Sequence, residues 1–113
     1  IHTISNFTIY MKDLAEIRRT MVKLYDVLKL NGCTSILVCE SPPGSTAISR
    51  SGVEEFVVDG VIMLYLVRDG AKFIPGIAIR KMRGVDHDRE IRLFNITSGG
   101  VVVYPTETMF TNI

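Results

Sequence analysis

The sequence has no tryptophan, only two cysteines and two histidines, and a net charge of only +1. Cys33 and Cys39 have no further cysteine or histidine at metal-ligand spacing, so we expect neither a disulfide framework nor a metal site. This cysteine usage favours a reducing, cytoplasmic setting. A chain so close to neutral has no overall field that would recruit nucleic acid, so any basic site must be local.

Long apolar runs and several signature motifs are also missing. No apolar stretch approaches the roughly 20 residues that a membrane span needs, and no signal peptide is visible, so we expect no membrane association. There is no Gly-x-x-x-x-Gly-Lys-Ser/Thr run to cradle phosphates, and no Gly-x-Ser-x-Gly elbow. The chain begins at Ile1 rather than Met, and we therefore expect its native start to lie upstream.

Apolar residues are nevertheless abundant enough for a core. They make up 47% of the 113 residues, which suits one small domain over the whole chain. Apolar side chains recur at helical spacing and predict a helix from about 12 to 30. Asp13 with Glu16 resembles a capping box at its start, and Asn31-Gly32 is a stop signal at its end.

The rest of the chain alternates between strand and turn signals. A continuous apolar run, Thr34–Cys39, predicts a strand covered on both faces, as in a parallel α/β sheet. Ser51 with Glu54 resembles a second capping box and predicts a short helix over Gly52–Val58. Further strands, the first also buried and the last ended by Pro105, are expected at Val61–Val67, Phe73–Met82, Glu90–Ile96 and Val101–Tyr104, with a hairpin turn at Asp69-Gly70. The predicted fold is α/β: helix, parallel strand, short helix, strand, then an antiparallel β meander.

A basic run follows the strand expected at Phe73–Met82. On a strand, residues two apart face the same way, so Lys81 and Arg83 should project together, and Gly84 would let a backbone or ligand come close. Two positive charges side by side repel each other, which favours an acidic ligand between them. An ammonium beside a planar guanidinium suits phosphate in particular. The alternative interpretation is a solvated basic strand end, since Lys and Arg are mostly surface residues.

Carboxylates offer a second kind of candidate. Glu40 follows the carboxyl end of the strand expected at Thr34–Cys39, which is where open α/β sheets bind ligands, although it could equally be an ordinary loop carboxylate. Glu54 and Glu55 are adjacent on a short helix and point in different directions, so they cannot act as a facing acid/base pair.

Two motifs in order resemble one known family. Residues 49–62, Ser-Arg-Ser-Gly-Val-Glu-Glu-Phe-Val-Val-Asp-Gly-Val-Ile, are similar to the Gly-Val-Glu-Glu-Phe stretch of the KaiC-like ATPases, a branch of the RecA superfamily. Lys81-Met82-Arg83-Gly84, followed by His87, resembles the Lys-x-Arg-Gly loop of the same family. The resemblance covers nearly the whole chain. It implies that residues 1–113 are the C-terminal part of a RecA-like P-loop NTPase core that lacks the half carrying the phosphate loop (Walker A).

The resemblance also implies a place for the basic run. In this family ATP sits between neighbouring subunits of a ring, usually a hexamer, and one subunit's Lys-x-Arg pair reaches the γ-phosphate held by its neighbour's phosphate loop. Lys81 and Arg83 would then contact the phosphate in trans, and Met82 would contribute a backbone contact. His87 would contact the sugar or base side of the nucleotide. Arg89 loosely matches a lysine found at this position in one domain of the family. The implied cofactor is ATP with Mg²⁺, held mainly by residues outside this chain, so the chain alone would not be an ATPase.

The sequence departs from the family in two places. Val85 replaces a frequent Ser or Thr, and His2 aligns where a magnesium-associated Asp is expected, which an imidazole does not replace. Without the first half of the core, the strands at Thr34–Cys39 and Val61–Val67 must close together or leave a gap for another chain. Uncovered edges and apolar faces favour association, so we expect a homo-oligomer, a dimer or higher.

A non-catalytic function remains open. A partial RecA-like domain could serve as an interaction or regulatory module. It could also bind nucleic acid weakly through a basic hairpin, in a salt-dependent manner. The residues that would make this contact are Arg80, Lys81, Arg83, Arg89 and Arg92.

Overall fold

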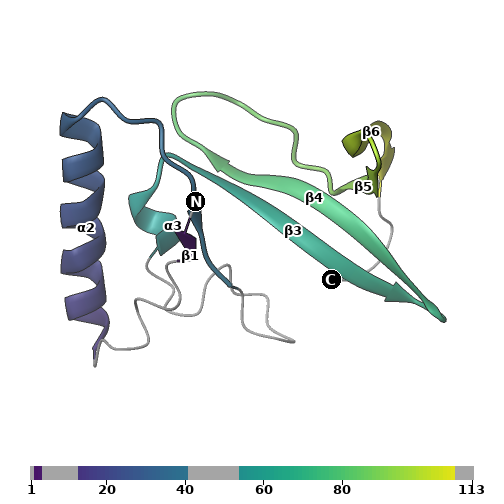
Figure 1. Ribbon diagram of the computed structural model, residues 1–113, viewed down its shortest axis with the longest axis horizontal. Helices are drawn as coiled ribbons and strands as arrows, with labels where there is room; N and C mark the ends of the chain where they lie inside the picture. The colour runs from purple at the N-terminus through teal and green to yellow at the C-terminus, as the bar shows by residue number, and fades with distance from the viewer. Residues whose placement is uncertain (1, 4–12, 41–53, 109–113) are drawn as a thin grey trace. The chain divides into compact units, whose positions relative to one another are not determined.

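The computed structural model describes residues 2–3, 13–40 and 54–108 (Figure 1). The chain divides into two compact units, residues 1–58 and 59–113. The elements in order are β1 (His2–Thr3), α2 (Leu14–Leu30), β2 (Leu37–Val38), α3 (Glu54–Val57), β3 (Gly60–Asp69), β4 (Lys72–Met82), β5 (Arg92–Thr97) and β6 (Gly100–Thr108). The predicted α/β class and the predicted order of elements are confirmed.

The helix α2 begins and ends where the capping signals indicate. Asp13 is its N-cap, and the Asp13 carboxylate accepts a 2.7 Å hydrogen bond from the backbone N–H of Glu16. At the other end the Asn31 N–H donates to the Val27 carbonyl, and Gly32 takes a positive φ of 66°. A left-handed residue after the last turn is the usual helix stop, because glycine has no Cβ to clash there.

One face of α2 supplies the core of the first unit. Ile17 and Met21, one turn apart, are 6% and 3% exposed. Partly buried apolar residues pack against this pair from the helix itself, from the segment around β2 and from α3: Leu24, Leu37, Cys39 and Val57. Burial of such side chains contributes about 1.5–3 kcal/mol each, so this small cluster stabilises the packing of α2. Cys39 thus packs as a small, partly buried apolar residue beside this cluster.

The strand β2 is shorter and more exposed than its sequence predicted. It pairs in parallel with β1, His2 opposite Leu37 and Thr3 opposite Val38, so the parallel orientation is confirmed. Only these two residues form the strand, and Ile36 beside it is exposed. The expectation of a six-residue strand covered on both faces is therefore wrong. A continuous apolar sequence is compatible with burial on both faces of a strand, but it does not show that another element packs on each face.

The short helix α3 ends close to the predicted position. It spans Glu54–Val57, and the chain enters β3 at Gly60 after a bend. The cap predicted at Ser51 and the start predicted at Gly52 lie outside the described residues. Among the described helices, none is long and apolar enough to cross a membrane.

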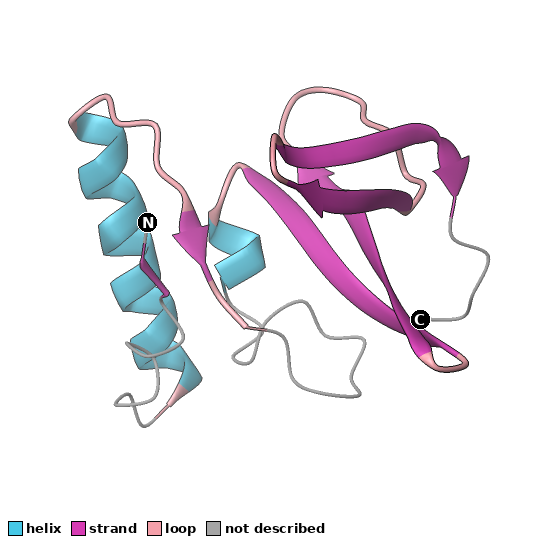
Figure 2. Cartoon of the chain, turned by 45° about the vertical axis from the view of Figure 1, so that its right-hand side comes forward, coloured by secondary structure: helices cyan, strands magenta, loops and turns pink. Residues whose placement is uncertain are grey.

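The second unit is built on a long antiparallel hairpin of β3 and β4 (Figure 2). Pairing runs from Gly60 opposite Met82 to Asp69 opposite Lys72. Gly70, with a φ of 60°, opens the connecting turn, as the Asp-Gly signal predicted. In the described part of the chain β3 is an edge of the four-stranded sheet β3-β4-β5-β6, and β2 belongs to a different sheet. The expectation that the strands at Thr34–Cys39 and Val61–Val67 close together, or leave a gap for another chain, stays a prediction.

The two faces of β3 differ sharply in exposure. Val61, Met63, Tyr65 and Val67 are half-buried. The alternating residues Ile62, Leu64 and Leu66 are 63%, 66% and 66% exposed, and we call this side the apolar face. The prediction that β3 is buried on both faces is wrong, because only one face is covered by the rest of the second unit.

The last strand runs past the proline expected to end it. β6 continues from Gly100 through Pro105 to Thr108. Its register with β5 jumps from Leu93–Tyr104 to Arg92–Thr108, so residues 105–107 lie in an irregularity between paired positions. Proline has no backbone N–H to donate to a neighbouring strand. At a bulge the regular pairing is interrupted, so this hydrogen bond is not required. The strand therefore passes Pro105 instead of stopping at it.

Candidate functional site

Lys81 lies at a β-bulge near the end of β4. Ile62 pairs with Ile79 and Val61 with Lys81, so Arg80 is the extra residue between two paired positions. Residues directly opposite in an antiparallel pair share a face, which places Lys81 on the side of Val61. Met82, opposite Gly60, falls on the other side.

Arg83 does not share the strand with Lys81, because β4 ends at Met82. Arg83 stands in the turn that follows. Its N–H donates to the Asp59 carbonyl at 2.8 Å, and its Nε lies 3.7 Å from the Asp59 carboxylate. The sequence predicted both residues on one strand, whereas Arg83 lies just past the end of β4; that the two side chains project together stays a prediction. Both partners of the ion pair are half-exposed, and such pairs contribute about 0–1 kcal/mol.

Gly84 sets the direction of the loop after β4. Its φ is 79°, a left-handed conformation that L side chains rarely adopt. No atom of the described chain comes within 4 Å of a Cβ built there. Within this chain, glycine is therefore required by backbone geometry rather than by a crowding neighbour.

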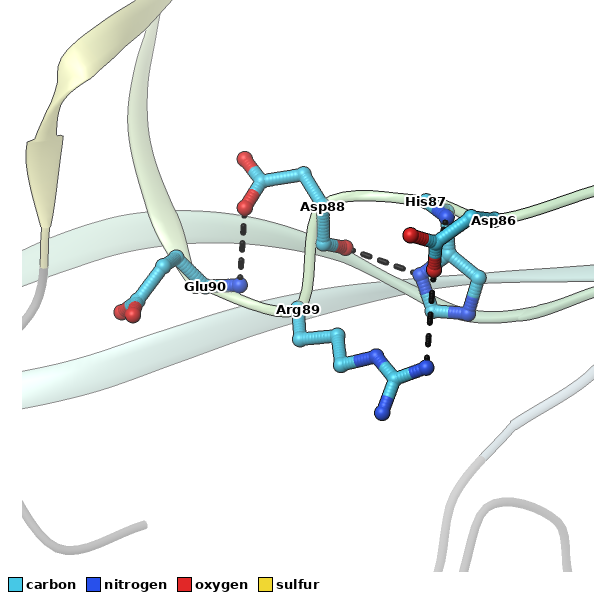
Figure 3. Close-up of polar contacts among 5 residues, drawn as sticks. All are labelled: Asp86, His87, Asp88, Arg89 and Glu90. Carbon is cyan, nitrogen blue, oxygen red and sulfur yellow. Dashed lines mark hydrogen bonds and ion pairs between the residues drawn. The ribbon is translucent and has the colours of Figure 1, made fainter.

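Two aspartates order the loop from Asp86 to Glu90 (Figure 3). Asp86 Oδ1 accepts from the His87 N–H at 2.9 Å and from Arg89 Nη2 at 3.5 Å. Asp88 Oδ1 accepts from the Glu90 N–H at 3.1 Å. These local bonds hold the loop in one shape, and Figure 3 shows the Asp88 carboxylate directed away from the Arg89 guanidinium.

The His87 ring is held in one tautomer. His87 Nδ1 lies 2.9 Å from the Asp88 carbonyl oxygen. A carbonyl only accepts, so Nδ1 must carry the hydrogen, and Nε2 of the neutral ring is left as an acceptor. A hydroxyl or amine donor is the matching group on a ligand.

An ion pair fastens the far end of this loop to β5. Arg92 Nε and Nη2 reach the two Asp88 oxygens at 2.8 and 3.3 Å. This contact, with the Glu90 N–H next in importance, holds the pKa of Asp88 below its usual value of 3.8. The same contact raises the pKa of the Arg92 guanidinium above its usual value. Asp88 therefore stays a carboxylate at any physiological pH.

Two of the predicted site residues meet at an open hollow of about 480 Å³ in the second unit. Arg80 Nη1 donates to the Tyr65 hydroxyl at 3.3 Å beside it. The lining contains two arginines, a histidine and a phenol but no carboxylate: Tyr65, Ala78, Ile79, Arg80, His87, Arg89 and Ile91. We call this surface the cationic hollow. Its chemistry suits an anion.

The other predicted residues lie elsewhere. Lys81, Met82 and Arg83 follow at the end of β4 and in the next turn, and are not part of the hollow lining. Glu40 is exposed just past β2, as predicted, in the first unit. His2 begins β1. Within the described ranges, no group of three or more His, Cys, Asp or Glu side chains could hold a metal ion.

Sequence reasoning missed Tyr65 and gave Arg80 a role only in nucleic-acid binding. The two residues are 15 positions apart and meet only through the hairpin register. A tyrosine within the apolar run Val61–Val67, on the face that Val61 and Lys81 share, is the signal that could have identified it.

Comparisons with known proteins agree on one family. The family model described as "ATPase: KaiC" matches residues 1–108. A UPF0273 protein of Pyrococcus furiosus is 34% identical over 102 residues, covering 90% of this chain and 41% of its own length. A circadian clock oscillator protein KaiC of Rippkaea orientalis is 38% identical over 93 residues, covering 82% of this chain and 18% of its own.

A solved structure shows the same similarity in three dimensions. A KaiC-like protein from Pyrococcus horikoshii OT3 superposes with a TM-score of 0.77 and 36% sequence identity. The match covers 93% of this chain and 47% of the other. The chain thus spans less than half the length of the proteins it matches.

Proposed function

This chain belongs to the KaiC ATPase family, and on that premise we propose that it supplies contacts in trans to an ATP molecule whose phosphates are held by another subunit's phosphate loop. No phosphate-loop motif occurs in its own sequence. The observation that supports the proposal most is the loop after β4, which carries His87 and Arg89 to one acid-free hollow in the same unit as Lys81 and Arg83.

Each residue of the loop has chemistry suited to this task. Lys81 provides a compact positive charge and Arg83 a planar fork, which match the oxygens of a terminal phosphate. Met82 would contribute its backbone. The Nε2 acceptor of His87 suits a ribose hydroxyl or a base amine, and Arg89 adds charge beside it. Mg²⁺ would be held mainly by residues outside this chain.

Arg83 would change partners when the phosphate arrives. Its contact with Asp59 is a half-exposed ion pair at 3.7 Å, which is easily exchanged. Fixed positive charge at the transferring phosphoryl group is worth about 10³–10⁵ in rate where one arginine provides it. Arg83 together with Lys81 is the group from which we expect that contribution.

A complementation assay tests the proposal. The second protein is a KaiC-family ATPase domain that keeps its phosphate loop but has its own Lys-x-Arg pair changed to alanine. Adding this chain should restore ATP hydrolysis, and the double variant Lys81→Ala/Arg83→Ala should restore about 10³-fold less. The double variant Arg68→Ala/Lys72→Ala, which removes equal charge at the turn end of the same hairpin, should behave as the unchanged chain.

Two results would count against the proposal. One is enzyme-like ATP hydrolysis by this chain alone, since it would place the phosphate site within these residues. The other is full restoration by the Lys81→Ala/Arg83→Ala variant.

We also propose that the chain associates with itself, as a dimer or a higher oligomer. The support is the apolar face, whose three aliphatic side chains are each about two-thirds exposed. Contiguous exposed apolar patches on an edge strand favour contact with another chain. Light scattering at micromolar concentration measures the mass, and a monomer at every concentration would rule out self-association.

Nucleic-acid binding has less support. Three of the five arginine and lysine residues that would contact a strand each face a carboxylate: Arg83 with Asp59, Arg89 with Asp86 and Arg92 with Asp88. Charges paired in this way release few counterions on binding a phosphate backbone. The single-strand affinity measured at low salt should therefore be weak and unchanged in Arg92→Ala.

A further inference from the structure

Arg80 occupies an irregular position in an otherwise regular hairpin. As the extra residue of the β4 bulge, it has no partner residue directly across on β3. Bulges re-aim a side chain and are common beside functional sites. Here the side chain reaches the hydroxyl of Tyr65, whose own partner across the hairpin is Gly76. The small residues Gly76 and Ala78, both buried, leave space on this face for the two long side chains to meet.

The contact made by Arg80 differs in charge from those of its neighbours. Arg83, Arg89 and Arg92 each lie against an aspartate. Within the part of the chain that the structure describes, Arg80 instead donates to a neutral phenol. A phenol orients a guanidinium without neutralising it, so the positive charge of Arg80 remains to attract an anion.

The contact between Arg80 and Tyr65 leaves both side chains with hydrogen-bond donors for one ligand. The Tyr65 oxygen accepts from Arg80 Nη1, so its own O–H can donate to another acceptor. The guanidinium has five N–H donors in a fixed fork, and those not used on Tyr65 can bind two oxygens of one phosphate. The hollow of about 480 Å³ also has the size of a small-molecule site.

We propose that Arg80, oriented by Tyr65, makes an additional phosphate contact in the cationic hollow, whose ligand is the polyphosphate group of a nucleotide. The identity of the ligand as a nucleotide rests on the proposed function, whereas anion binding by the hollow does not. Arg80 thereby favours nucleotides with several phosphates over nucleosides, because only the nucleotides bring anionic phosphate oxygens to its guanidinium.

Calorimetric titration of the full 113-residue chain tests this proposal directly. The probes are sodium tripolyphosphate, ATP and adenosine, each at low and at physiological salt. Tripolyphosphate and ATP should bind, and adenosine should bind at least tenfold more weakly. Arg80→Ala and Arg80→Gln should each weaken tripolyphosphate binding about tenfold, and Arg80→Lys should recover part of it. Tyr65→Phe, which keeps the ring and removes the hydroxyl, should weaken it severalfold.

The control is Arg68→Ala, which removes an exposed arginine from the turn end of the same hairpin, where its Nε bonds the Gly70 carbonyl. Equal losses in Arg68→Ala and Arg80→Ala would show charge attraction without a site and would overturn the proposal. So would the absence of tripolyphosphate binding, or unchanged binding in Arg80→Gln.

The same variants separate this inference from the proposed function. Arg80-dependent binding of tripolyphosphate, together with failure of the complementation assay, would keep the anion site and remove its role in trans. Successful complementation with unchanged anion binding in Arg80→Gln would keep the trans contacts and refute the additional phosphate contact.

Discussion

The two faces of the β3–β4 hairpin contain the same strands but are completed in different ways. On one face the chain folds its own loop back, so that His87 and Arg89 join Tyr65 and Arg80 around the cationic hollow. On the other face Ile62, Leu64 and Leu66 remain about two-thirds exposed. The first face is therefore partly enclosed by the chain's own loop, whereas the second is exposed in the described part of the chain.

The largest effect is expected on the apolar face. Leu64→Asp should weaken self-association about 100-fold or more, because a buried leucine contributes about 1.5–3 kcal/mol and a buried charge adds a desolvation cost. Light scattering over a concentration series measures the change. Leu30→Asp is the matched control, since Leu30 is 87% exposed at the end of α2. An unchanged mass for Leu64→Asp would mean that this face is not the contact.

A smaller effect is expected where the chain turns from β4 toward the hollow. Gly84→Ala should lower the free energy of unfolding by about 1–2 kcal/mol, because its φ of 79° strains any L side chain. Thermal unfolding followed by circular dichroism measures the loss. Gly99→Ala should be nearly neutral, since its Cβ would meet only Thr97 Oγ1 at an ordinary 3.8 Å. Equal stabilities for the two variants would contradict the argument from φ.

We expect higher ATP affinity when the ion pair between Arg83 and Asp59 is removed. Asp59→Asn removes the carboxylate 3.7 Å from its Nε, and an exposed pair is worth about 0–1 kcal/mol. ATP affinity in the complementation complex should therefore rise by up to about fivefold. The contrasting variant Arg83→Ala should lower it. If Asp59→Asn weakens ATP binding, Asp59 positions Arg83 for the phosphate instead of competing with it.

The smallest effect concerns pH. The pKa of Asp88 is lowered by Arg92, so the carboxylate favours the folded state above its ordinary value of 3.8. That contribution should be lost only as the pH falls below 3.8 through the lowered pKa. NMR titration of the Asp88 carboxyl carbon measures this, and Arg92→Gln should return the pKa toward 3.8. A titration midpoint at or above 3.8 in the unchanged chain would disprove the contact in solution.

Local signals in the sequence predicted local structure well. Asp13 and the Asn31-Gly32 pair determine the ends of α2 through short-range hydrogen bonds and backbone φ, so a reader of the sequence can locate both. The Asp69-Gly70 turn is readable for the same reason. The burial of a strand, however, depends on residues that are distant in the sequence. The apolar sequences of β2 and β3 do not show whether another element packs on them. The prediction that both strands are buried on two faces was therefore wrong.

The candidate site was only partly readable. His87 and Arg89 could be chosen from a motif, but Tyr65 meets Arg80 through the register of a hairpin and a one-residue bulge. The Asp69-Gly70 turn indicates the register close to it, but no residue type marks the bulge at Arg80. Pro105 was misread because the bulge that accommodates it depends on the partner strand β5.

The open edge of β3 has a consequence for hydrogen exchange. In an antiparallel pair, alternate residues direct their N–H groups toward the partner strand, and the others point away. In the described part of the chain β3 pairs only with β4, so protected and unprotected amides should alternate along its ten residues. Slow exchange at every second amide would thus report an edge to which no further strand is paired. Slow exchange at all of them would reveal that another strand has joined this edge.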